Sequence, residues 1–193
     1  MKRFILLIGF GSFAFSSFSQ KTDLLEFEKK RVSVSKKSML VLGGWSVANI
    51  VVSGIATDTR NKEMRYFHQM NVMWGGINLA IAGLGYWGAG REKIDNPTLA
   101  SVLKHQSKTE KTYLINTGLD VLYVGAGLWM NKASDHQKNP DKFSGYGNSI
   151  MLQGGVLLLY DAVNYAIHRK HGKLLDKVEL SGGPGSVSMI YKF

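Results

Sequence analysis

Charged residues are unevenly distributed along the chain, and four long segments contain almost none. Residues 38–57 and 66–90 have no Asp, Glu, Lys or Arg, and residues 113–131 and 143–168 have one Asp each. At about 1.5 Å per helical residue, each segment is long enough to cross about 30 Å of hydrocarbon. None has the strict alternation of a barrel strand or the charged stripe of a soluble helix. The pattern predicts an all-α membrane protein with a bundle of four transmembrane helices.

The N-terminus has the pattern of a targeting segment. Two basic residues precede the apolar run 4–15, and Ser17 and Ser19 provide the small residues of a cleavage site. These features predict a secretory signal peptide at residues 1–19. The alternative is a short uncleaved anchor, although the run is shorter than the roughly 20 apolar residues that span a bilayer.

The remaining chain divides into three parts. Residues 20–37 form a polar juxtamembrane segment, residues 38–168 the transmembrane domain, and residues 169–193 a basic C-terminal tail. In the tail, apolar and polar side chains alternate over 186–193, after a glycine-rich stretch at 182–185 that is typical of a turn. A single hairpin cannot close a barrel, so we expect a small hairpin at the membrane surface.

Two connections give local predictions. The basic run Lys29-Lys30-Arg31 is expected to face solvent or lipid headgroups. Between the second and third segments, Asn96-Pro97 predicts the start of a helix, with asparagine as the cap and proline in the first turn.

The second and third charge-poor segments resemble each other. Residues 76–87 align with residues 118–129 so that glycines coincide, Trp matches Trp, and Asn78 matches Asp120. The first and fourth segments match more weakly. This similarity predicts an inverted repeat of two helix hairpins. The alternative is chance similarity among glycine-rich apolar helices.

Small residues recur at helical spacing within the segments. Small side chains on one face let membrane helices approach closely, so we expect these positions to lie in helix–helix contacts. They are Gly44, Ala48, Gly76, Ala80, Gly83, Gly118, Gly125, Gly155 and Ala162.

Polar residues lie near the middle of each charge-poor segment, where hydrocarbon would surround them. Buried polar groups in a membrane are costly unless they are paired, so we expect these side chains to point at one another. The candidate site residues are Asn49, Asn78, Asp120, Tyr123, Asp161 and Asn164.

The two aspartates allow two interpretations. No Lys or Arg lies inside any segment to neutralise Asp120 or Asp161, and desolvation and mutual repulsion both disfavour their charged forms. In the first interpretation, they hydrogen-bond to Asn and Tyr and fix helix register. In the second, they form a site for a proton, a cation or a polar ligand. The absence of a signature motif favours the first.

Composition removes several classes of chemistry. The chain contains no cysteine, which excludes disulfides, thiol nucleophiles and cysteine-ligated metals. His68 and His168 fall at opposite ends of alternating spans, which disfavours a two-histidine site. We therefore predict no catalytic residue, no metal and no cofactor. The net charge of +10 fits anionic lipid headgroups better than nucleic acid, because no nucleic-acid recognition fold is visible.

Membrane orientation has two alternatives. The distribution of Lys and Arg places both tails in the cytoplasm by the positive-inside rule, whereas a cleaved signal peptide places the N-terminal tail outside. The predicted location is the cell membrane, multi-pass, most simply the inner membrane of a Gram-negative bacterium. The predicted partners are membrane lipids, a second copy of the chain or another membrane protein.

Several stretches resemble an uncharacterised family of small membrane proteins in Bacteroidetes, classed as a domain of unknown function. They are residues 18–20, 67–74, 118–121 and 152–161. The resemblance covers roughly residues 38–168. It implies a four-helix membrane fold and a Gram-negative host, and it implies no activity.

Three functions remain open. The first is a non-enzymatic bundle with a polar core that acts as an accessory or interaction subunit, or binds a small ligand. The second is a small proton- or cation-coupled transporter that works as a dimer through Asp120 and Asp161. The third, a membrane enzyme or haem protein, is weakest because no nucleophile–base or ligand pair is visible in the sequence.

Overall fold

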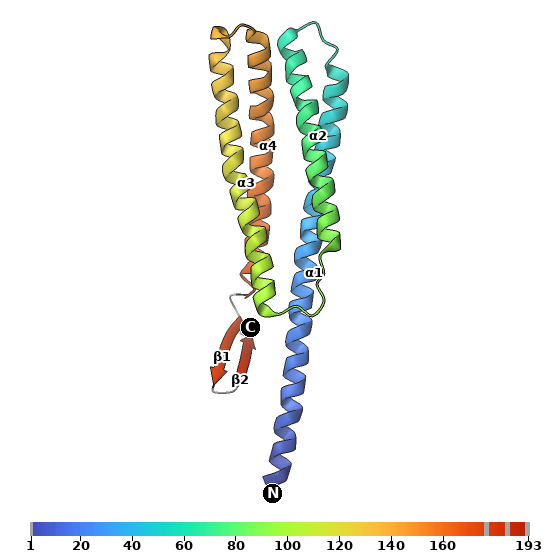
Figure 1. Ribbon diagram of the computed structural model, residues 1–193, viewed down its shortest axis with the longest axis vertical. Coiled ribbons are helices and arrows are strands. Elements are labelled where there is room, and N and C mark those ends of the chain that lie inside the picture. Colours follow the sequence, from blue (N-terminus) through green and yellow to red (C-terminus); the bar gives the residue numbers. More distant parts are fainter. Residues whose placement is uncertain (1, 176–177, 184–185, 192–193) are drawn as a thin grey trace.

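The computed structural model describes the backbone of residues 2–175, 178–183 and 186–191, with side chains described from Asp23 to Leu175. Within this part of the chain it consists of long helices followed by a two-stranded hairpin (Figure 1). The elements are α1 (Lys2–Ala56), α2 (Lys62–Arg91), α3 (Leu99–Ala133), the 3-10 helix η1 (Ser134–His136), α4 (Pro140–Gly172), β1 (Val178–Gly183) and β2 (Ser186–Tyr191).

The helices form two antiparallel hairpins that lie side by side, α1 with α2 and α3 with α4 (Figure 1). The loops inside the hairpins, 57–61 and 134–139, lie at one end of the bundle, and the connection between the hairpins, 92–98, lies at the other. Apart from Thr57, each charge-poor segment lies within a single helix. The prediction of a helical bundle is therefore confirmed.

The helices extend beyond the charge-poor segments because polar and charged residues continue them. Residues 20–37 are helical and continuous with the first predicted span, and α1 includes the backbone of the predicted signal segment from Lys2 onward. Side chains of residues 1–22 lie outside the described part, so cleavage of the signal peptide stays a prediction.

The start of α3 differs from the sequence prediction. The helix begins at Leu99, with Thr98 rather than Asn96 as its N-cap. Thr98 Oγ1 accepts from the backbone N–H of Ser101 at 3.2 Å, and Ser101 Oγ accepts from the backbone N–H of Thr98 at 3.0 Å. This reciprocal capping box satisfies two backbone donors and outcompetes a start at Asn96-Pro97. Asn96 instead adopts a left-handed conformation with φ 49°.

The polarity of the bundle is reversed relative to a water-soluble protein. Among the described side chains, the buried polar residues outnumber the buried hydrophobic ones. Large apolar side chains face outward on every long helix: Ile55 is 77% exposed, Leu84 69%, Leu122 67% and Leu159 69%. Soluble proteins bury such residues and expose the polar ones.

Two of the described helical stretches are long and apolar enough to cross a membrane. They are Asp23–Ala56 in α1 and Pro140–Gly172 in α4. The spans predicted in α2 and α3 do not reach the same hydropathy, because glycine and uncharged polar or aromatic residues dilute their apolar stretches. A bundle of four spans therefore stays a prediction.

Close helix contacts occur at glycines other than those predicted. A Cβ atom at Gly127 of α3 would lie 2.6 Å from the Gly147 carbonyl oxygen of α4, and one at Gly154 would lie 2.9 Å from the Tyr123 Cβ atom. Gly75 makes the equivalent close contact between α2 and α1, against Ile50. These positions have no room for a side chain, so they set the spacing of the helices.

The glycines of the predicted contact faces lie mostly in open space. A Cβ atom at any of them would meet no atom within 4 Å among the described residues, so the predicted small-residue contacts are wrong at these positions. They are Gly44, Gly76, Gly83, Gly118, Gly125 and Gly155. Each helix carries glycines on more than one face, and the spacing alone does not tell which face is covered.

The chain ends in an antiparallel hairpin. Val178 of β1 pairs with Tyr191 of β2, and Gly183 pairs with Ser186 next to the turn. This is the region in which the alternation predicts a hairpin. The predicted turn residues 184–185 and the terminal residues 192–193 lie outside the described part.

Candidate functional site

The six candidate residues predicted from the sequence are found in three places. Asn49, Asn78, Asp120, Asp161 and Asn164 are buried, and Tyr123 is partly buried. Four of them line one cavity, Asn49 belongs to a separate hydrogen-bonded cluster, and Asn164 pairs with α1. The expectation that all six converge is therefore only partly met.

A polar seam joins α1, α2 and α4; we use this name for Trp45, Asn49, Asn71, Ser149 and Gln153. Gln153 Nε2 donates to Asn49 Oδ1 at 2.9 Å and to Asn71 Oδ1 at 2.8 Å. Ser149 Oγ also donates to Asn71 Oδ1, at 2.8 Å. Trp45 Nε1 donates to Gln153 Oε1 at 3.2 Å. The seam is internally satisfied, which is the condition for stable burial of polar groups.

Of the five seam residues, only Asn49 was among the candidates predicted from the sequence. Ser149 and Gln153 are both fully buried. Their i, i+4 spacing continues to Leu157 and Asp161, which places them on one face of α4. That continuity with Asp161 is the signal that could have identified them.

Asn164 is held apart from the other candidates. Its Oδ1 atom accepts a hydrogen bond from Ser38 Oγ, and its Nδ2 atom donates to the Tyr160 carbonyl oxygen at 2.8 Å. The first bond joins α4 to α1, the second lies within α4, and together they use both ends of the amide. The side chain serves helix packing in this arrangement.

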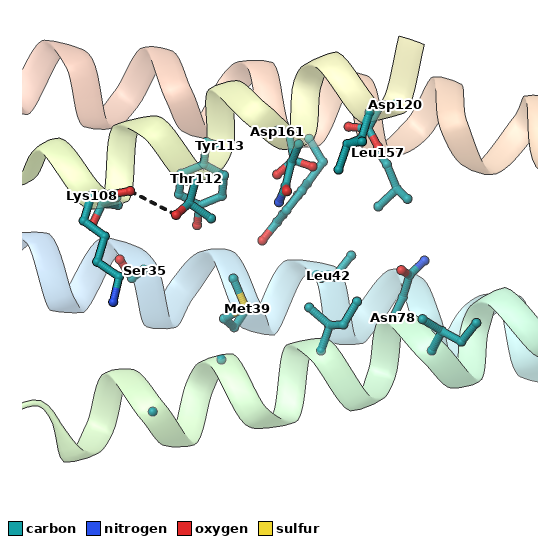
Figure 2. A pocket seen from close by; sticks show the side chains of 18 of the residues that line it. Ser35, Met39, Leu42, Asn78, Lys108, Thr112, Tyr113, Asp120, Leu157 and Asp161 are labelled. Atoms are coloured by element: carbon teal, nitrogen blue, oxygen red, sulfur yellow. Dashed lines mark hydrogen bonds between the residues drawn. The ribbon is translucent and has the colours of Figure 1, made fainter. Parts of the chain in front are cut away.

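A cavity of about 880 Å³ lies between the two hairpins and is lined by all four long helices; we call it the inter-hairpin cavity. Figure 2 shows its length, with Lys108 and Ser35 toward one end and Asn78 and Asp120 toward the other. Lys108 and Asp120 are both on α3, and twelve residues of helix separate them by about 18 Å.

The two ends of the cavity differ in chemistry. The charged end is lined by Arg31, Arg91, Glu92, His105 and Lys108. The polar end is lined by Asn78, Asn116, Asp120, Tyr123 and Asp161. Apolar side chains lie between and around them, including Met39, Leu42, Ile77, Ile81, Leu119 and Leu157.

Asp120 of α3 and Asp161 of α4 form a carboxyl pair at the polar end. Both side chains line this end of the cavity together with Asn116. The two residues are 3% and 5% exposed. Carboxyl groups that share a buried site resist double ionisation unless a cation compensates their charge.

Four buried polar atoms of cavity-lining residues have no hydrogen-bond partner in the described part of the chain. They are Trp74 Nε1 and Asn78 Nδ2 on α2, Asp120 Oδ2 on α3 and Tyr160 Oη on α4. Buried polar atoms in folded proteins are almost always hydrogen-bonded. Two N–H donors, one hydroxyl and one carboxyl oxygen thus belong to residues that border the same space, which is suited to a polar occupant.

An ion-pair cluster lies at the charged end. Arg31 Nη2 lies 2.6 Å from Glu28 Oε2 and also pairs with Glu92. His105 Nδ1 lies 3.3 Å from the same Glu28 oxygen. Arg31 is only 4% exposed, so the prediction that the run 29–31 faces solvent is wrong for this residue. It is buried because the N-terminal part of α1 packs against the start of α3.

The same cluster contains the only grouping of metal-ligand type within the described residues. Glu28, Glu92 and His105 each offer one ligand atom, and these atoms lie within 4.8 Å of one another. The Arg31 guanidinium hydrogen-bonds to both carboxylates. It therefore occupies the position of a cation between them, and the ion pairs account for the cluster without a metal.

These features define the class of the protein: a bundle of two helix hairpins with a polar interior, an apolar exterior and one large cavity between the hairpins. The chain belongs to the family of unknown function DUF6992, which matches residues 41–162. The prediction of an uncharacterised family is confirmed to that extent. The matched region includes the polar seam and the polar end of the cavity, whereas Arg31 and Asn164 lie outside it. No curated protein and no solved structure matches the chain.

Proposed function

We propose that this protein is an integral membrane protein that crosses the bilayer with all four long helices and binds a small polar ligand in the inter-hairpin cavity. It acts by binding, as an accessory or interaction subunit, and not by catalysis. One observation carries the ligand-binding part: the unpartnered polar atoms of Trp74, Asn78 and Asp120 surround the same cavity.

The reversed polarity of the bundle supports the membrane part. Exposed leucines, isoleucines and valines lie on all four helices, including α2 and α3. A soluble protein with so much exposed apolar surface would aggregate, whereas lipid tails cover it at no cost. The proposal places the protein in the inner membrane of a Gram-negative bacterium, the host that the family resemblance implies.

Cysteine labelling tests the four-span topology directly, because the natural chain has no cysteine. Single substitutions Arg60→Cys, Asp95→Cys and Lys138→Cys place a thiol at exposed positions in the three connections. With a membrane-impermeant maleimide, we expect positions 60 and 138 to label from one side and position 95 from the other. Labelling of all three from the same side, or recovery of the protein in the soluble fraction, would overturn the topology.

Native mass spectrometry tests the ligand-binding part. The wild-type protein, purified from membranes in mild detergent, is expected to carry additional mass that survives gentle activation. The variant Asn78→Leu fills the polar end with an apolar side chain and is expected to lose that mass. The matched variant Asn148→Leu, on α4 and outside the cavity lining, is expected to retain it. A wild-type protein without bound mass in repeated preparations would contradict the proposal.

The carboxyl pair supports a second candidate, a small proton- or cation-coupled transporter acting as a dimer. Asp120 and Asp161 lie at one end of a cavity that reaches the charged end of the bundle, and ionisable pairs inside membranes commonly mark proton or ion paths. Reconstituted vesicles with an internal pH dye distinguish the two functions. Transport predicts proton flux that Asp161→Asn abolishes, and pure binding predicts none.

A further inference from the structure

We infer that the ligand of the inter-hairpin cavity is a small organic cation, a protonated amine that also carries a hydrogen-bond acceptor. It binds at the polar end, with its ammonium group at Asp120 and Asp161. This inference rests on the proposed function and specifies the chemical class of the ligand.

The charge at the polar end is uncompensated within the described structure. The basic residues that line the cavity are Arg31, Arg91 and Lys108, and all three lie toward the charged end. Arg31 is paired with two glutamates, and the Arg91 guanidinium lies over the Trp87 ring at 4.2 Å. A carboxylate that is buried away from these basic residues needs a counter-ion, and a ligand ammonium group can provide it.

The wall of the cavity formed by α2, opposite the two aspartates, requires a hydrogen-bond acceptor on the same ligand. Asn78 is 2% exposed, and its Nδ2 atom is one of the buried donors without a partner in the described chain. Figure 2 shows this side chain directed from α2 across the cavity, toward the helices that carry Asp120 and Asp161. Trp74 Nε1 adds a second free donor on α2. A metal ion offers no acceptor for these N–H groups, whereas an amine with a hydroxyl or carbonyl oxygen satisfies both walls.

Aromatic rings around the cavity fit an organic cation. Trp74 and Tyr123 meet edge to face with centroids 5.1 Å apart, and Tyr113 and Tyr160 do so at 6.5 Å. All four residues line the cavity. Aromatic faces attract ammonium groups, most strongly where water is excluded. A cavity of about 880 Å³ also far exceeds the size of an inorganic ion, and its apolar side chains suit an alkyl portion.

Calorimetric titration of the full-length protein in mild detergent tests this inference. The probe is 6-amino-1-hexanol, which carries an ammonium group, an alkyl chain and a hydroxyl acceptor. The matched neutral probe is 1,6-hexanediol, and sodium chloride tests an inorganic cation. The buffer is phosphate, so that no competing amine is present. We expect saturable binding of the amino alcohol, at least about tenfold weaker binding of the diol, and no competition by sodium chloride.

Variants connect the binding to the carboxyl pair. Asp120→Asn and Asp161→Asn, singly and together, are expected to weaken binding of the amino alcohol by about tenfold or more. Asp135→Asn, an exposed aspartate in η1, is the matched control and should bind like wild type. Thermal melting shows whether each variant is folded. If the double variant is not folded, the two single variants provide the test.

The outcomes separate the inference from the proposed function. If the diol binds as tightly as the amino alcohol and Asn78→Leu abolishes both, the cavity binds polar ligands but the amine assignment is wrong. Displacement of the amino alcohol by sodium chloride would assign the pair to an inorganic cation instead. If neither probe binds, the amine assignment fails, and the native mass spectrum alone decides whether the cavity holds a different ligand.

Discussion

The side-chain amide of Gln153 in α4 donates a hydrogen bond to Asn49 in α1, 104 positions earlier in the sequence, at 2.9 Å. The same nitrogen donates to Asn71 in α2 at 2.8 Å. One fully buried side chain thus ties the second hairpin to both helices of the first. If the bundle lies in a bilayer as proposed, apolar contacts between its helices provide little driving force, and such polar contacts specify which helices pair.

The first prediction concerns this amide. Gln153→Ala leaves Asn49 Oδ1 and Trp45 Nε1 without their partner and removes one of the two donors to Asn71 Oδ1. We expect it to lower the free energy of unfolding by about 1–3 kcal/mol. Gln137→Ala, at an exposed position after η1, should change it little. Thermal unfolding in mild detergent, followed by circular dichroism, measures the difference. Equal midpoints for the two variants would show that the seam does not hold the hairpins together.

The second prediction contrasts two buried asparagines on α2. Asn71 accepts hydrogen bonds from Ser149 and Gln153, whereas Asn78 Nδ2 has no partner within the described residues. Replacing a satisfied amide by an apolar residue leaves its partners unpaired, but replacing an unsatisfied one removes a desolvation penalty. We expect Asn71→Leu to destabilise the ligand-free protein by about 1–3 kcal/mol, and Asn78→Leu to leave its stability unchanged or raised. Unfolding midpoints measured after ligand removal check both expectations. If Asn78→Leu lowered the stability more than Asn71→Leu, the unpartnered state of Asn78 would be refuted.

The third prediction compares two glycines that are two residues apart on α3. A Cβ atom at Gly127 would lie 2.6 Å from the Gly147 carbonyl oxygen, whereas one at Gly125 would meet nothing within 4 Å in the described chain. Gly127→Ala should therefore destabilise the bundle by about 1–3 kcal/mol through overpacking. Gly125→Ala should stabilise it slightly, by up to about 1 kcal/mol, because alanine favours the helix. Thermal unfolding of the two variants gives opposite signs if the α3–α4 contact is as described.

The fourth prediction concerns the buried ion pairs at the charged end. Arg31→Met leaves Glu28, which is 1% exposed, without its main counter-ion. Removing one partner of a buried pair typically costs about 3–5 kcal/mol, and we expect the lower part of that range because His105 also contacts Glu28. Lys30→Met, at the exposed neighbouring position, should have little effect. The double variant Arg31→Met with Glu28→Gln should regain part of the loss, and failure to do so would mean that the two side chains do not interact energetically.

The distribution of charge along the sequence was sufficient to predict the helices. Four segments without basic residues became parts of four helices, and the polar residues near their midpoints are buried: Asn49, Asn78, Asp120 and Asp161. Both results follow from one physical fact, the cost of placing polar groups in an apolar environment. That cost depends on the residue types in a segment and on the length of the segment. Both can be read from one segment of the sequence, without knowledge of its neighbours in the fold.

The pairing of helices could not be predicted in the same way. Asn49 and Asn78 have similar positions in their segments, but one joins the polar seam and the other faces the cavity. The difference depends on the rotation of each helix about its own axis and on its axial position relative to the neighbouring helices. Burial of Arg31 likewise depends on α3 packing against the N-terminal half of α1, which no local pattern records.

The glycine contacts between α3 and α4 restrict how sequences in this family can diverge. Gly127, Gly147 and Gly154 each lie against backbone or Cβ atoms of the opposite helix, so even alanine requires the helices to separate. We therefore expect relatives to retain glycine at these three positions. The open glycines, such as Gly118 and Gly125, are free to be replaced over evolutionary time. A few glycine positions thus preserve the spacing of the two helices, while the exposed apolar surface around them is free to change.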